Sequence, residues 1–184
     1  MASKIKVDQI QTADGSGTIA LQNQLSGMTT ASVPTLDYTK MPAGSIIQYA
    51  SNTSGGTSYS TTSTSYVDSG HDILFTPHLS NSKIHVVLQS RRCNLVTADV
   101  LNIQIQRDDT TVIGTHSNGD GSVHFADHDS SGGNQVSLGL NFGWEDSPNT
   151  TSQVKYTAYF KVNTGTGYLA DSGGVQFYVY EIKQ

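Results

Sequence analysis

The chain has 184 residues, a mass of 19.7 kDa and a formal net charge of −5 at pH 7. This length suits one domain of ordinary size with a short appendage. Hydrophobic residues make up 35% and charged residues 14%, against usual values of about 45–50% and about 25%. Good helix formers are scarce, whereas Val, Ile, Thr and Tyr are frequent, which excludes a helical bundle and favours β-sheet.

The charge distribution argues against nucleic acid and membrane partners. The ten Lys and Arg residues are scattered, and the sole adjacent pair is Arg91-Arg92, so no basic surface for phosphate binding is expected. No apolar run approaches the roughly 20 residues that cross a bilayer, and the N-terminus lacks the apolar region of a secretory signal. The single Cys93 cannot form an intrachain disulfide, and we expect it to be a small buried hydrophobe.

The first 42 residues contain isolated apolar side chains among polar ones. None of these stretches is long enough to bury a face of its own, so residues 1–42 should be disordered in an isolated chain. We therefore predict an extended N-terminal arm that is ordered either by copies of itself, as in a homotrimer, or by a larger assembly to which it would anchor the protein. The predicted anchoring and trimerisation residues are Ile5, Val7, Ile10, Ile19, Leu21, Leu25, Val33 and Leu36.

Residues 43–184 show short segments of alternating hydrophobicity between turn signals. The predicted strands are 45–50, 64–68, 73–76, 84–90, 100–107, 111–115, 123–126, 135–142, 154–162, 167–170 and 175–182. Alternation with period two indicates half-buried antiparallel strands. The spacing predicts an all-β fold, an antiparallel β-sandwich of jelly-roll type. The polar stretch 51–65 is expected to be an exposed loop, or alternatively an edge strand.

Catalytic motifs are absent from the sequence. There is no G-x-S-x-G segment, and the six histidines stand in no nucleophile motif. Asp108 and Asp109 are adjacent carboxylates, but at a hairpin tip we expect them to be solvated with diverging side chains. We predict that the protein is not an enzyme and needs no cofactor.

One cluster has the composition of a metal site. His124, Asp127 and His128 provide two imidazoles and a carboxylate within five residues. In a continuous strand the two histidines would be about 13 Å apart, too far for one ion, although a turn or a threefold axis could bring such groups together. The alternative is a solvated polar loop, which we favour.

Aromatic residues are candidates for contact with a receptor. Trp144 and nine tyrosines could stack on sugar rings, but tyrosines that alternate within strands more often pack in a core or between subunits. We expect Tyr59 and Tyr168 to lie in loops, and they are the preferred candidates for receptor contact.

Several segments also resemble a known group of proteins. KIKVDQIQTADGSGTIAL at 4–21, MPAGSIIQY at 41–49, TTSTSYVDSG at 61–70 and IQRDDTTVIG at 105–114 resemble segments of short tail-fibre and virion-surface proteins of bacteriophages, especially marine ones. The closing segment DSPNTTSQVKYTAYFKVNTGTGYL and the final strand VQFYVYEI are also similar to that pattern. Asp109 stands where these proteins usually have Gly.

The resemblance implies a homotrimeric, non-enzymatic protein on the virion surface, made in the host cytoplasm. It would dock on other virion proteins through its N-terminal arm and display a β-rich head, with a host surface glycan as a possible target. One alternative is a capsid-decoration protein whose arm clamps shell subunits. The other is a free lectin-like carbohydrate-binding module.

Overall fold

The structure is a computed structural model that describes residues 37–54, 58–96, 100–114, 123–126, 136–171 and 174–184. The chain divides into two compact units, Met1–Asp37 and Tyr38–Gln184. All eight predicted anchoring residues lie outside the described residues, so the predicted arm stays a prediction. The second unit is called the β-domain below.

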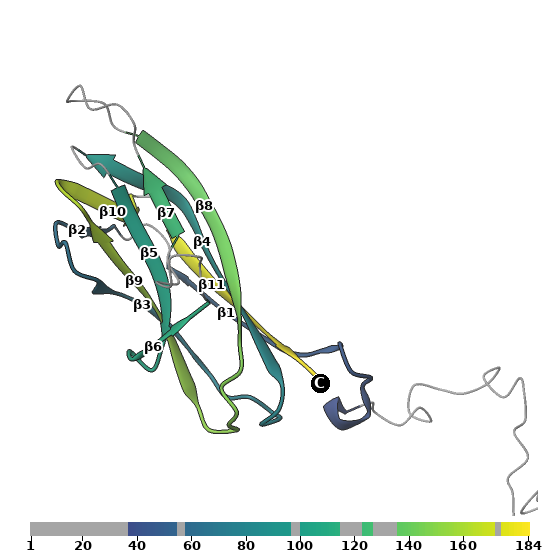
Figure 1. Cartoon of the computed structure of the whole chain (residues 1–184). Helices are drawn as coiled ribbons and strands as arrows, with labels where there is room; N and C mark the ends of the chain where they lie inside the picture. Colours follow the sequence, from purple (N-terminus) through teal and green to yellow (C-terminus); the bar gives the residue numbers. More distant parts are fainter. Residues whose placement is uncertain (1–36, 55–57, 97–99, 115–122, 127–135, 172–173) are drawn as a thin grey trace, which may run out of the picture. The chain divides into compact units, whose positions relative to one another are not determined.

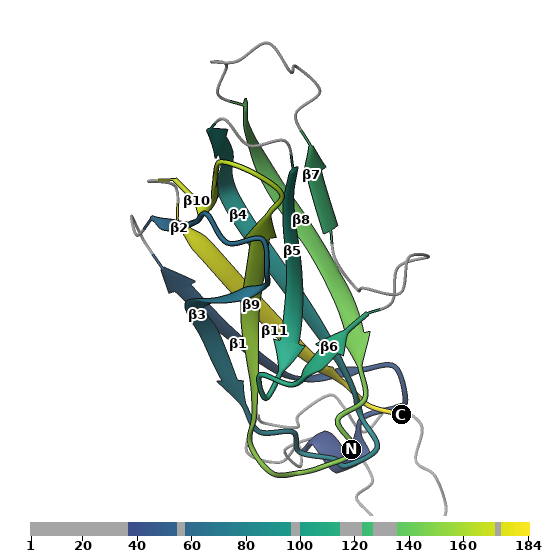
Figure 2. The same cartoon turned by 60° about the vertical axis from the view of Figure 1, so that its left-hand side comes forward.

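The β-domain consists of two antiparallel sheets packed face to face (Figures 1 and 2). In sheet 1 the strand order is β1–β11–β4–β10–β2, and β8 pairs with the other edge of β4. In sheet 2 the order is β3–β9–β5–β6, and β7 also pairs with β5. The strands are β1 (Ile46–Ser54), β2 (Tyr59–Thr61), β3 (Val67–Phe75), β4 (Lys83–Val96), β5 (Val100–Arg107), β6 (Thr111–Ile113), β7 (Val123–Ala126), β8 (Val136–Asp146), β9 (Val154–Val162), β10 (Thr166–Ala170) and β11 (Val175–Ile182). The all-β, two-sheet prediction is confirmed.

The core lies between the sheets and is built by the alternation seen in the sequence. In β11, Val175, Phe177 and Val179 are buried, whereas the residues between them face outward. Because each buried aliphatic or aromatic side chain contributes about 1.5–3 kcal/mol, this inner layer dominates the stability of the fold. The largest fully buried side chains include Tyr156, Phe160, Phe177, Ile84, Leu88, Leu95 and Leu101.

β5 departs from the expected half-buried pattern. Its outward-facing Asn102 and Gln104 are each 3% exposed, so most of this strand is buried on both faces. Both residues lie beside β9, where Lys161 and Tyr159 are their register partners. Alternation in the sequence correctly separated the apolar from the polar face but gave no sign that the polar face is also covered.

Several strand boundaries differ from the prediction. Residues 64–68 and 73–76 were expected to form two strands, but Val67–Phe75 is one strand with a register shift between Asp68 and Asp72. Gly70 has a φ of 73° at this irregularity, a conformation that glycine adopts without strain. The loop interpretation of 51–65 is wrong in part, because residues 51–54 complete β1 and Tyr59–Thr61 form β2.

The first described residues are tied to the C-terminus. Tyr38–Lys40 form a single 3-10 turn, and the Lys183 ammonium donates hydrogen bonds to the carbonyl oxygens of Thr39 and Met41, each at 2.6 Å. The Tyr38 ring stacks on His78, with centroids 4.4 Å apart. The segment that leads into β1 is therefore fixed at one end of the β-domain, beside the end of β11.

A buried carboxylate organises the same end. Glu181 is fully buried and accepts hydrogen bonds from the backbone amides of His78 and Leu79, both at 2.9 Å, and from the Ser82 hydroxyl at 2.7 Å. These bonds satisfy the charge and hold the β3–β4 connection against the sheet.

Candidate binding surfaces

The described residues contain no recognisable metal centre. No group of three or more His, Cys, Asp or Glu side chains in this part of the chain is placed to hold an ion. His124 belongs to β7, but its side chain, Asp127 and His128 lie outside what the structure describes, so the predicted cluster stays untested. No helix among the described residues is long and apolar enough to cross a membrane.

The adjacent carboxylates of the β5–β6 hairpin support the fold. Asp108 and Asp109 have φ values of 51° and 57°, as the residues of a tight hairpin turn require. Both residues are exposed, but their side chains do not diverge into solvent as predicted. Asp108 accepts a hydrogen bond from the Lys155 amide at 2.9 Å, and Asp109 pairs with the Lys155 ammonium, which lowers the pKa of Asp109. They brace the hairpin against β9.

Cys93 is buried, as predicted. Its Sγ lies 3.3 Å from the carbonyl oxygen of Leu169, and burial raises the pKa of the thiol to about 11. A thiol in this state is a poor nucleophile, because the reactive thiolate is scarce at neutral pH.

The predicted receptor tyrosines do not lie in loops. Tyr59 belongs to β2 and Tyr168 to β10, and these strands pair with each other. Tyr59 packs against the core, with its ring 5.8 Å from the ring of His71. Tyr168 is half-buried in β10, beside Asn94 of β4. Strand pairing and packing therefore constrain both residues more than the sequence indicated.

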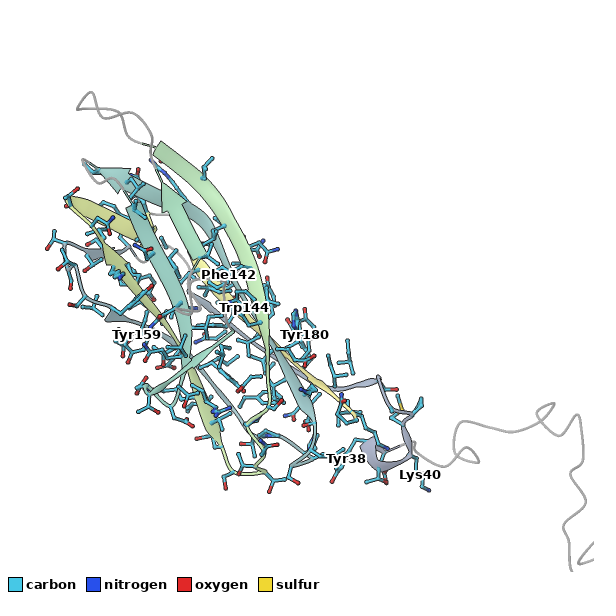
Figure 3. The ribbon with its side chains drawn as sticks, viewed as in Figure 1. Tyr38, Lys40, Phe142, Trp144, Tyr159 and Tyr180 are labelled. Atoms are coloured by element: carbon cyan, nitrogen blue, oxygen red, sulfur yellow. The ribbon has the colours of Figure 1, made fainter. Side chains whose placement is uncertain are left out.

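Trp144 is also withdrawn from solvent. It lies on the inner face of β8 with Phe142, and both pack against the core (Figure 3). The indole nitrogen is buried without a hydrogen-bond partner among the described residues. Gly114 lies against the indole, since a Cβ there would come within 2.6 Å of Trp144 Cε2. Trp144 is thus unsuited to stacking on a sugar.

The largest described group of outward-facing aromatic rings lies on the outer face of sheet 1. Register places Tyr49, Tyr180 and His85 side by side in β1, β11 and β4. The next row toward the other end of these strands contains Tyr178 and Val87. We call this surface the tyrosine face and define it by Tyr49, His85, Val87, Gly143, Tyr178 and Tyr180.

The rings of the tyrosine face are contiguous. The Tyr49 centroid lies 5.3 Å from that of Tyr180 and 6.5 Å from that of Tyr178, and His85 lies 6.4 Å from Tyr180. Tyr49 is 53% exposed. Gly143 packs closely against β4, because a Cβ there would lie 2.8 Å from the carbonyl oxygen of Val86 and 2.9 Å from Val87 Cγ2. Sequence analysis did not single out Tyr49 or His85. The one local signal for this face is that Tyr178 and Tyr180 are two residues apart in a predicted strand and therefore lie on the same side of it.

The outer face of sheet 2 is different in character. Its central positions are polar, including Gln104, Thr157, Tyr159 and Lys161, and Figure 3 shows Tyr159 on the side of the sandwich opposite Tyr180. Lys161 lies over the Tyr66 ring, 4.6 Å from its centroid. The two outer faces of the β-domain thus differ in polarity.

Comparison with models of known protein families finds no match to this chain. None of the curated proteins matches it either. A proposal for its function therefore has to rest on the geometry and on the sequence resemblance.

Proposed function

We propose that the chain is a non-enzymatic structural protein of a bacteriophage virion, a homotrimeric fibre-like or tip protein. The N-terminal arm, residues 1–42, would anchor it to other virion proteins, and the head, residues 43–184, would contact the host surface. The proposal rests on the sequence resemblance together with the difference between the two ends of the β-domain. It assigns the protein no catalytic or cofactor-dependent role.

The observation that carries the proposal is that the segment leading into β1 and the C-terminus lie at the same end of the β-domain. The segment leading into β1 and the C-terminus are joined by backbone hydrogen bonds, from Gly44 N to Lys183 O at 2.7 Å and from Lys183 N to Ser45 O at 3.0 Å. β1, β4 and β11 run from this end to the opposite one, where Ser54 pairs with Val175 and Val175 with Ser90. An arm that anchored the protein at this end would leave the connections at the other end facing away from the particle.

Those distant connections suit recognition. Three of them join β4 to β5, β7 to β8 and β9 to β10, and they meet sheet 1 at Val96, Val136 and Thr166, at the end that lies away from Lys183. Loops held by rigid sheets are the common place for binding residues. The β8–β9 connection, in contrast, follows Asp146, the register partner of Ile84 at the end that carries Lys183. We therefore remove it from the candidate host-contact surface.

The strand order supports the jelly-roll part of the proposal. Four strands of sheet 1, β1, β11, β4 and β8, face β3, β9, β5 and the pair β6 and β7 of sheet 2. The connections β3–β4, β4–β5, β7–β8 and β8–β9 each cross between the sheets, as in a jelly roll, a fold that viral capsid and lectin domains use. This architecture supports a display or binding role rather than a particular chemistry.

Two measurements test the proposal. Gold-labelled antibody against the β-domain should mark the tail of intact particles, and particles carrying a protein that lacks residues 1–42 should show no label although that protein is folded. Purified full-length protein in excess should slow adsorption of particles to host cells, because it competes for the same receptor. Label on the capsid with unchanged adsorption would instead favour decoration, and normal incorporation of the truncated protein would disprove anchoring by the arm.

A further inference from the structure

We infer that the tyrosine face is the surface through which the β-domains of neighbouring copies pack together in the trimer. This inference rests on the proposed homotrimer and adds the surface that forms it. The partner is a second copy of this chain, and around a threefold axis the contact joins different residues of the two copies.

The first argument is the apolar character of the face. Ile46 is 58% exposed and Tyr49 is 53% exposed, and both project from β1 on the outer side of sheet 1. Aromatic residues are enriched in the buried centre of protein interfaces, where they supply a large contact area. The outer face of sheet 2 also exposes Leu74 and Val112, but its central positions, including Gln104, Tyr159 and Lys161, are polar. Burial of the outer face of sheet 1 by a partner is therefore more favourable than burial of the outer face of sheet 2.

The second argument is that many polar groups around the rings are already paired. The Tyr178 hydroxyl donates to Gln176 and lies 3.4 Å from Gln89 Oε1. Lys83 forms an ion pair with Glu145 at 3.0 Å and donates to the Ser147 hydroxyl at 2.9 Å. A sugar site needs free donors and acceptors beside its aromatic rings, whereas a protein interface needs a face without unpaired charge. The ion pair of Lys83 with Glu145 meets this requirement of a protein interface.

The third argument is position. The tyrosine face includes the first strand after the arm, and Ile46 and Tyr49 follow within five residues of Gly44, which is hydrogen-bonded to Lys183. If three arms meet, the first outward-facing residues of β1 are close to the point where the chains converge. Neighbouring copies held together by their arms would therefore be available to cover this face.

The test compares full-length wild type with Y49K/Y180K and with the control L74K. Leu74 is a matched control because it is 55% exposed and lies on β3 in sheet 2. By size-exclusion chromatography with light scattering at micromolar concentration, wild type and L74K should have a mass of about 59 kDa, that of three 19.7 kDa chains. Y49K/Y180K should shift to about 20 kDa while its circular dichroism remains that of a folded β-protein.

If the double variant does not fold, the single variant Y49K and hydroxyl-radical labelling of wild type still test the interface. Y49K alters an exposed residue of an edge strand, so it should fold and should shift at least half of the protein to monomer. In wild type, hydroxyl-radical labelling of Tyr49 should fall at least threefold relative to Leu74 when the trimer forms.

The outcomes separate the two proposals. A trimeric wild type with trimeric Y49K and Y49K/Y180K would overturn the tyrosine-face interface and leave the trimer standing. A monomeric wild type would overturn both. Trimeric variants that no longer slow adsorption would assign the face to the host receptor instead.

Discussion

The Arg107 guanidinium holds the Asp146 carboxylate across the gap between the two sheets, with Nη1 2.7 Å from both carboxylate oxygens. Arg107 ends β5 in sheet 2 and Asp146 ends β8 in sheet 1. The Tyr156 hydroxyl donates a third hydrogen bond to Asp146 at 2.9 Å, and burial together with this negative charge raises the pKa of Tyr156. A polar cluster thus links the two sheets where β5 and β8 end.

Replacing Arg107 with Ala should destabilise the β-domain by about 3 kcal/mol, because removing one partner of a largely buried pair leaves the other charge uncompensated. The Arg107 and Asp146 side chains are only 19% and 10% exposed. Urea unfolding of R107A, D146N and the double variant would give the coupling energy. K83A, which breaks the exposed pair with Glu145, should cost under about 1 kcal/mol. Equal losses in R107A and K83A would contradict this account.

Replacing Glu181 with Ala should cost about 3 kcal/mol and loosen the β3–β4 connection. The substitution leaves the buried amides of His78 and Leu79 without an acceptor, and each unsatisfied group costs about 1–3 kcal/mol. Hydrogen exchange should accelerate at these two amides more than in β5. E145A, which removes an exposed carboxylate from the same sheet, is the control. Unchanged exchange at 78 and 79 in E181A would show that other contacts hold the connection.

Sequence analysis predicted strands well where alternation was long and turn residues flanked it. β5, β7, β9 and β11 have the predicted limits. Their inner and outer faces are encoded locally, since a strand's side chains alternate whatever it pairs with.

The features that depend on pairing were not predictable in this way. β4 continues to Val96 because it passes a register shift between Ser90 and Cys93 and then pairs with β10. Tyr59 lies in a strand of three residues that exists through its pairing with β10, so nothing local distinguished it from a loop.

The tyrosine face illustrates the same limit. Tyr49 and Tyr180 are 131 positions apart in the sequence, and the register of β1 with β11 makes them neighbours. Alternation shows which residues of one strand share a face, but the order of strands in a sheet is decided by long-range packing. A surface built across three or four strands therefore becomes visible only in the structure.

The Cys93 thiol should be unreactive in the folded protein. Because burial raises its pKa from 9.0 to about 11, the thiolate fraction at pH 8 falls about 100-fold, before any effect of steric exclusion. Incubation with a chromogenic disulfide reagent at pH 8 should therefore release little thiolate from native protein within an hour and one equivalent in denaturant. Rapid stoichiometric release from native protein would show that the β4–β10 region opens readily.

Stability should fall as the pH drops from about 7.5 to 5.5, and His71 should be a major cause. The imidazole is buried between Phe177, at 5.3 Å, and Tyr59, and its Nε2 has no hydrogen-bond partner in the described part of the chain. Burial lowers the pKa of His71, although Asp72 opposes the shift. The unfolded chain, with a histidine pKa of about 6.5, then binds more protons than the folded chain, so stability is complete above that pH and is lost below it.

The variant H71F removes the titrating group and keeps an aromatic ring against Phe177, so its melting temperature should change less between pH 7.5 and 5.5 than that of wild type. H78F, which makes the same exchange at an exposed histidine that stacks on Tyr38 outside the core, is the control. The melting temperatures must be compared as differences between the two pH values, since the larger Phe ring can itself alter packing. If H71F and wild type lost the same number of degrees, protonation of His71 would not account for the acid sensitivity.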